Sequence, residues 1–185
     1  MTTSQIEALR VQDNFARAHK VLDKIYLWSG YSAATCLCLI LVIIVAQIGI
    51  RYSGNNLSGL QTYAGYMMAA STFLGLPYAL INGSHIRIET IAKLLPPGPR
   101  RALDLIAFCA GTIVALWLAY YACNMVFTSW QINDVSTDLD ATPLWIPQST
   151  MAIGSLLFAI AMIDNFLTLL ITGKYRIHSN FQASH

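Results

Sequence analysis

The chain has 185 residues, of which 56% are hydrophobic and only 11% charged, with a mean hydropathy of +0.53 and a formal net charge of +2. Because soluble globular proteins carry about 25% charged residues, this composition excludes an ordinary soluble domain. The small net charge gives no reason to expect a nucleic-acid partner, since the basic residues gather beside apolar stretches. All four cysteines lie inside apolar runs, so we expect packing residues rather than disulfides or metal ligands: Cys36, Cys38, Cys109 and Cys123.

Four apolar stretches follow a polar N-terminal segment. They cover about residues 25–50, 62–82, 102–127 and 148–172. At ~1.5 Å per helical residue, the first is ~39 Å long, which exceeds the ~30 Å thickness of a bilayer core. We therefore predict an all-α integral membrane protein whose transmembrane domain, residues 25–172, contains four transmembrane helices.

The N-terminal segment, residues 1–24, is polar but carries an apolar stripe. Apolar side chains recur in it at steps of four and three: Val11, Phe15, Ala18, Leu22 and Ile25. This amphipathic pattern indicates a helix that either lies on the membrane surface or extends the first span into the cytoplasm. Tyr26 and Trp28, at the start of that span, are expected to be interface anchors. The polar segment is too long for a signal peptide, and we predict none.

A segment of mixed character separates the second and third spans. Ile86, Ile88 and Ile91 alternate with Arg87 and Glu89, and prolines at 96, 97 and 99 close the segment. Apolar and charged residues interleaved in this way suit an amphipathic helix among the lipid headgroups. We predict an interfacial helical stretch here that ends at the prolines.

Lysine and arginine are distributed unevenly around the spans. The N-terminal segment has four, the first loop has one (Arg51), the segment between the second and third spans has four, the last loop has none, and the tail, residues 173–185, has two. Cytoplasmic loops carry an excess of basic residues. Both termini and the middle loop are therefore expected to be cytoplasmic, in a multi-pass membrane protein. The two poorly basic loops are expected to face outward.

The third span contains a seam of small side chains at every fourth residue: Ala107, Gly111, Ala115, Ala119 and Cys123. Small residues allow two membrane helices to approach closely, because lipid supplies no hydrophobic drive for their association. The seam predicts a helix packed against this face. That helix could belong to the same chain or to another protein.

The chain offers little from which to build a reaction. The histidines all lie in polar segments, which argues against haem ligation: His19, His85, His178 and His185. Asp164 lies within the fourth span and Asp104 near the start of the third; we expect Asp164 either to pair with a basic group or to carry a proton. No phosphate loop, nucleophile arrangement or metal-ligand spacing is present. We predict no enzyme activity and no cofactor.

Several short motifs together are more informative. The second span contains Phe73-Leu74-Gly75, and the segment after it contains His85-Ile86-Arg87-Ile88-Glu89 and then Leu95-Pro96-Pro97. The last span opens with Pro143-Leu144-Trp145-Ile146-Pro147, followed by Gly154. The first span is closed by Arg51. This combination resembles the small membrane (permease) subunit of tripartite ATP-independent periplasmic (TRAP) transporters, over nearly the whole chain after Lys24. It departs at Leu60-Gln61-Thr62, where the family commonly has a Trp and an acidic residue, so a partner contact through those acids does not carry over.

The resemblance implies an accessory role, in a protein of the bacterial inner membrane. In that family a large membrane subunit carries the sodium-coupled path, a periplasmic binding protein delivers an organic anion, and the small subunit packs beside the large one. The residues expected to contact a partner or phospholipids are Arg51, His85, Arg87, Glu89, Gly111, Ala115, Ala119 and Asp164. Two alternatives remain open at this point: a self-sufficient proton-coupled transporter, and a membrane anchor of a respiratory complex.

Overall fold

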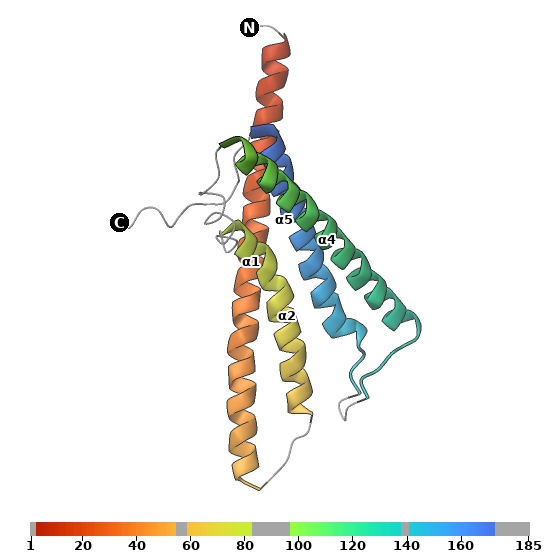
Figure 1. The fold of residues 1–185 in the computed structure, drawn as a ribbon. Helices are drawn as coiled ribbons and strands as arrows, with labels where there is room; N and C mark the ends of the chain where they lie inside the picture. The colour runs from red at the N-terminus through yellow and green to blue at the C-terminus, as the bar shows by residue number, and fades with distance from the viewer. Residues whose placement is uncertain (1–2, 55–58, 83–96, 138–140, 173–185) are drawn as a thin grey trace, which may run out of the picture.

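The computed structural model describes residues 3–54, 59–82, 97–137 and 141–172. Within these ranges the chain forms four helices: α1 (Thr3–Tyr52), α2 (Leu60–Ile81), α4 (Pro97–Gln131) and α5 (Trp145–Thr172) (Figure 1). The described residues contain no β-strand, and an isolated bridge between Val135 and Pro143 joins the two arms of the loop between α4 and α5. The predicted all-α class is confirmed.

Each helix contains a stretch long and apolar enough to cross a membrane: His19–Tyr52, Leu60–Ile81, Ala102–Gln131 and Trp145–Ile171. An α-helix satisfies its own backbone hydrogen bonds, as the bilayer interior requires. The outer surface is strongly apolar; for example, Leu41 and Val45 are 64% and 60% exposed. Such a surface suits lipid rather than water, and the prediction of four transmembrane helices is confirmed.

Helix α1 is one continuous helix of 50 residues, which corresponds to ~75 Å. It unites the polar N-terminal segment with the first apolar stretch. The N-terminal segment therefore extends the first span and does not form a separate helix on the membrane surface. In Figure 1 the N-terminal part of α1 rises beyond the ends of the other helices.

The helices follow one another across the molecule in the order α1, α2, α5, α4, because α2 packs against α1 and α5 while α4 packs mainly against α5. Two ends can be defined in Figure 1. The terminus side holds the beginnings of α1 and α4 and the ends of α2 and α5, whereas the loop side holds the α1–α2 and α4–α5 connections. The arrangement is an open row of two antiparallel hairpins, α1–α2 and α4–α5.

Several helix boundaries differ from the expected ones, and α4 begins at Pro97 rather than at residue 102. Helix α4 continues past Phe127 to Gln131. Helix α5 begins at Trp145 rather than near residue 148 and includes Pro147. Proline is tolerated in the first turn, where its missing N–H has no helical partner to lose. The predicted interfacial stretch, apart from residues 97–101, and the tail fall within 83–96 and 173–185, outside the described residues.

The inner face of α1 has a regular pattern. Its buried and half-buried residues alternate at steps of three and four: Tyr26, Ser29, Ala33, Cys36, Ile40, Ile43, Gln47 and Ile50. This 3.5-residue repeat keeps one face of a helix directed at a neighbour over many turns. The first three of these residues are buried and the later ones only half-buried, so the packing of α1 loosens toward the loop side.

Candidate functional site

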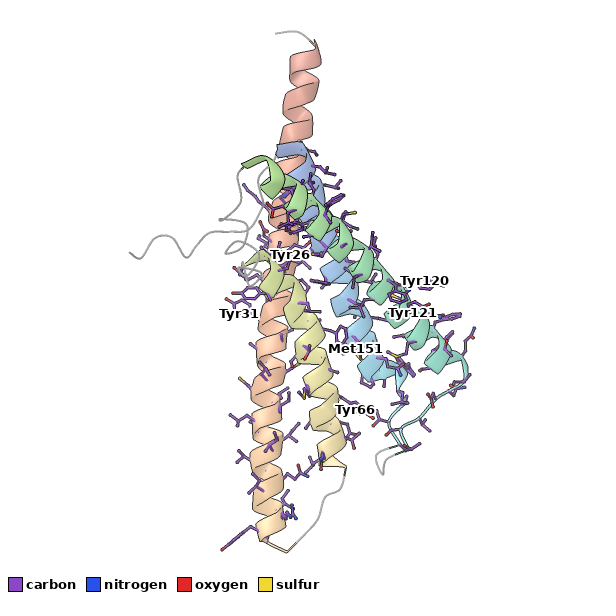
Figure 2. The ribbon with its side chains drawn as sticks, in the orientation of Figure 1. Tyr26, Tyr31, Tyr66, Tyr120, Tyr121 and Met151 are labelled. Carbon is purple, nitrogen blue, oxygen red and sulfur yellow. The ribbon has the colours of Figure 1, made fainter. Side chains whose placement is uncertain are left out.

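The core lies where the four helices come together toward the terminus side. Every helix contributes to it: Tyr26 from α1, Leu80 and Ile81 from α2, Ala115 and Ala119 from α4, and Ala159, Ala161 and Met162 from α5. Figure 2 shows Tyr26 at this convergence. The side chain of Tyr26 is 1% exposed, so its predicted role as an interface anchor is wrong, whereas Trp28 is 70% exposed and remains free to anchor.

The two hairpins meet at a backbone contact between α2 and α5. A Cβ at Gly154 would lie 2.5 Å from the carbonyl carbon of Phe73 and 2.6 Å from its oxygen. Pro77 lies four residues after Phe73 and lacks an N–H, so it leaves this carbonyl without its helical hydrogen bond. The absence of a side chain at Gly154 therefore lets α5 approach α2 at a carbonyl that the helix itself does not satisfy.

Within the first hairpin, α1 and α2 are joined by a similar pair of features. Ser29 Oγ donates a hydrogen bond to the carbonyl oxygen of Leu74. A Cβ at Gly30 would lie 2.6 Å from the ring of Tyr78. The ring of Tyr78 thus occupies the space that any larger residue at position 30 would need, and this fixes the register of α1 against α2 on the terminus side.

The small-residue seam of α4 packs against α5 of the same chain. Ala115 and Ala119 are 0% and 3% exposed, and a Cβ at Gly111 would collide with Cε of Met162. The sequence left open whether the facing helix belonged to this chain. In the structure it does, and these three residues lie toward α5 rather than on the outer surface.

A polar contact joins α1 and α5 on the terminus side. His19 Nε2 lies 3.8 Å from Asp164 Oδ1, with side chains 19% and 14% exposed. Asp104, at the start of α4, is also buried, at 5% exposed. Of the two roles considered for Asp164, the contact with His19 favours the structural one. Within the described residues no group of three His, Cys, Asp or Glu side chains could hold a metal ion.

The remaining predicted contact residues lie near the membrane edges. Arg51 is exposed at the loop-side end of α1, on the same side as the α4–α5 loop that contains Asp134. Asp134 is half-buried, and its backbone N–H donates to the carbonyl oxygen of Ser129 at 2.9 Å. His85, Arg87 and Glu89 lie outside the described residues.

Comparison with known proteins agrees with this architecture. Residues 40–172 match the family described as "Tripartite ATP-independent periplasmic transporters, DctQ component". The chain belongs to this family. By its description, this family consists of components of tripartite transporters. Family membership and the four apolar helices indicate a multi-pass protein of the inner membrane.

A curated relative agrees with membership of the DctQ family. The chain is 40% identical over 55 residues to the ectoine TRAP transporter small permease protein TeaB of Halomonas elongata. That segment is 30% of this chain and 28% of the relative, so the chain matches less than a third of the relative's length. The predicted resemblance to small TRAP permease subunits is confirmed.

Sequence reasoning missed two structurally important residues of this DctQ component. An aromatic residue at the start of a span suggests an anchor, but the alternating steps from Tyr26 to Ile50 place Tyr26 on the inward face of α1. Gly154 belongs to the motif that opens the last span, and the motif does not indicate its contact with α2. Its partner carbonyl could have been found from Pro77, which leaves the carbonyl of Phe73 free on the adjacent helix.

Proposed function

We propose that this DctQ component is the accessory scaffold subunit of a sodium-coupled, binding-protein-dependent TRAP transporter, and that it packs against the large transport subunit. The observation that carries the proposal is the open row of helices. Each described helix packs extensively against only one or two neighbours, so the described part of the chain does not enclose a path of its own across the membrane. Extensive outer faces remain for a partner.

The polar interior is consistent with a scaffold. Several buried polar groups donate within their own helix: Thr112 Oγ1 to the carbonyl oxygen of Phe108 at 2.7 Å, Ser155 Oγ to that of Ala152 at 3.0 Å, and Asn165 Nδ2 to that of Ala161 at 2.8 Å. Asp164 faces His19. Groups used in this way stabilise a static bundle, whereas a coupling ion needs converging ligands.

The proposal includes a topology and a set of contacts. Both termini are cytoplasmic, by the distribution of lysine and arginine. The outward-facing loops, with Arg51 and Asp134, are near the docked binding protein, and the segment with His85, Arg87 and Glu89 contacts phospholipid headgroups or the large subunit. The transported solute is an organic anion selected by the other two subunits. The name of TeaB assigns ectoine to that relative's transporter, and transport assays should therefore include it.

Purification from the native membrane in mild detergent tests the proposal. We expect a tagged chain to retain a large multi-span subunit in equal amount, and reconstituted vesicles to take up solute only when both membrane subunits, the binding protein and a sodium gradient are present. Uptake by the chain alone, abolished by Asp164→Asn, would instead establish a self-sufficient transporter. Haem absorbance in the purified protein would indicate a respiratory anchor.

Topology is tested separately. Cysteine-reactive reagents that do not cross the membrane should label a cysteine introduced at Ser53 from the periplasmic side only. Labelling from the cytoplasmic side would reverse the proposed orientation.

A further inference from the structure

The face of α4 opposite α5 carries polar groups within the membrane. Nine residues are about two and a half helical turns, so Asn124 lies on the far side of α4 from the buried Ala115. Tyr120 and Tyr121 share this outer face and are 66% and 54% exposed. Figure 2 shows both tyrosines on the side of α4 turned away from α5.

These groups lie within the stretch of α4 that a bilayer core would cover. The apolar span of α4, Ala102–Gln131, has 30 residues. A bilayer core of ~30 Å accommodates roughly its central 20 residues, and this stretch includes Tyr120, Tyr121 and Asn124. Trp130, which is 60% exposed, lies beyond it toward the loop side, at a position suited to an interface anchor.

Within the part of the chain that the structure describes, the side chain of Asn124 is exposed and has no hydrogen-bond partner. The rings of Tyr120 and Tyr121 contact one another edge to face, with centroids 5.5 Å apart, and Tyr121 also contacts Trp117 at 5.4 Å. These ring contacts order the face but do not satisfy the amide of Asn124. An asparagine amide carries two N–H donors and one acceptor oxygen, which lipid chains cannot satisfy.

The outer face of α1 provides the contrast. Between Ala34 and Gly49 its exposed side chains are apolar apart from Thr35 and Cys38. Thr35 Oγ1 donates to the carbonyl oxygen of Tyr31 at 2.9 Å, so its hydroxyl is satisfied within the helix. The α1 face therefore suits lipid, whereas the α4 face requires a protein that supplies hydrogen bonds.

We propose that the α4 face formed by Trp117, Tyr120, Tyr121 and Asn124 is the surface on which a transmembrane helix of the large TRAP subunit docks, with a hydrogen-bonding group of that subunit opposite Asn124. This inference rests on the proposed scaffold function. The large subunit is favoured over a second copy of this chain because a tripartite system requires the two membrane components to meet within the bilayer. Asparagine is also one of the side chains that form hydrogen bonds between membrane helices.

Site-directed photo-crosslinking in the complete complex tests this surface. The photoreactive residue benzoylphenylalanine replaces Tyr121 in one variant and Leu41, which is 64% exposed on α1, in the control. The two positions are matched in depth, because each lies about 15 Å from the loop-side end of its helix. We expect the Tyr121 variant to form an adduct with the mass of this chain plus the large subunit, and the Leu41 variant to form none.

Other outcomes overturn the inference in distinguishable ways. An adduct of twice this chain's mass at position 121 would show that a second copy occupies the face, and adducts with lipid alone would show that it is unoccupied. An adduct with the large subunit at position 41 but not at position 121 would move the interface to α1. If the unmodified chain retained no large subunit at all, the proposed function would fail together with the inference.

A second measurement isolates the hydrogen bond. Asn124→Leu preserves side-chain size but removes the amide, and it should lower the amount of large subunit retained by about threefold, the size expected for one interhelical hydrogen bond in a membrane. Asn124→Gln keeps an amide at this position and should retain nearly as much large subunit as the wild type. Equal retention by the wild type and both variants would contradict the proposed role of Asn124.

Discussion

The two hairpins of this molecule are packed by different means. In α4–α5, fully buried residues continue along the whole contact, from Asp104 to Ser129 on α4 and from Ala152 to Leu169 on α5. In α1–α2 they stop at Ala33 on α1, and the inward positions beyond it are only half-buried. The first hairpin is tight on the terminus side alone.

Side-chain size differs between the two contacts. Helix α4 presents a small residue to α5 at every turn from Ala107 to Cys123, so the two helices can pack closely along this stretch. The inward positions of α1 beyond Ala33 include Ile40, Ile43, Gln47 and Ile50, larger side chains that α2 does not cover completely. Because lipid competes with apolar side chains on equal terms, close backbone approach and hydrogen bonds decide how firmly two membrane helices associate.

The largest effect is expected where the hairpins join. Gly154→Leu would insert a side chain against the backbone of Phe73, which cannot move without displacing α2. We expect a loss of about 3 kcal/mol or more, at or above the top of the range for overpacking. Unfolding by sodium dodecyl sulfate in mixed micelles measures the loss. Gly65→Leu is the matched control, since nothing lies within 4 Å of a Cβ at that position. Equal stability of the two variants would contradict the contact.

Overpacking of the α4–α5 seam comes next. Ala115 is 0% exposed, and Ala115→Leu should push α4 away from α5 at a cost of about 1–3 kcal/mol. Ala110→Leu, on the exposed side of the same helix, should be nearly neutral. Thermal unfolding in detergent measures both. If Ala110→Leu proved the more damaging, the seam would not be the side of α4 that packs.

A smaller effect is expected in the loose half of the first hairpin. Ile43→Ala removes a half-buried side chain from the inner face of α1. We expect a loss of stability of about 1 kcal/mol or less, because lipid can fill the space. The adjacent Ile44→Ala, at a position 43% exposed, is the control. A loss near that of Ala115→Leu would mean that α1 and α2 are as tightly packed there as α4 and α5, and would remove the distinction between the hairpins.

The smallest effect is expected for Gly111→Ala. Its Cβ would meet only Cε of Met162, the flexible end of a long side chain, and alanine gains about 1 kcal/mol of helix propensity over glycine. The two terms should nearly cancel. Gly154→Ala makes the same change against backbone and should be clearly destabilising. Similar unfolding midpoints for these variants would show that the nature of the facing atom does not matter.

The sequence was sufficient to predict the fold class, because long apolar stretches have few ways to satisfy their backbones in lipid. It predicted that the face of α4 with Ala115 packs against a helix, but it could not identify that helix as α5, since a small-residue seam carries no information about its partner. Tyr26 was misassigned because an aromatic residue at a membrane boundary and one at a helix junction look alike until the whole inward stripe is considered. The contact of Gly154 with Phe73 depends on two helices far apart in sequence.

The unbroken course of α1 has a mechanical consequence. A helix without a hinge between Thr3 and Tyr52 tilts as one rigid rod, and its contact with the bundle nearest the N-terminus is the one between His19 and Asp164. About 16 residues, or roughly 24 Å, separate Thr3 from this contact. A change of ~10° in the tilt of α1 would therefore move the N-terminal tip by about 4 Å relative to the bundle.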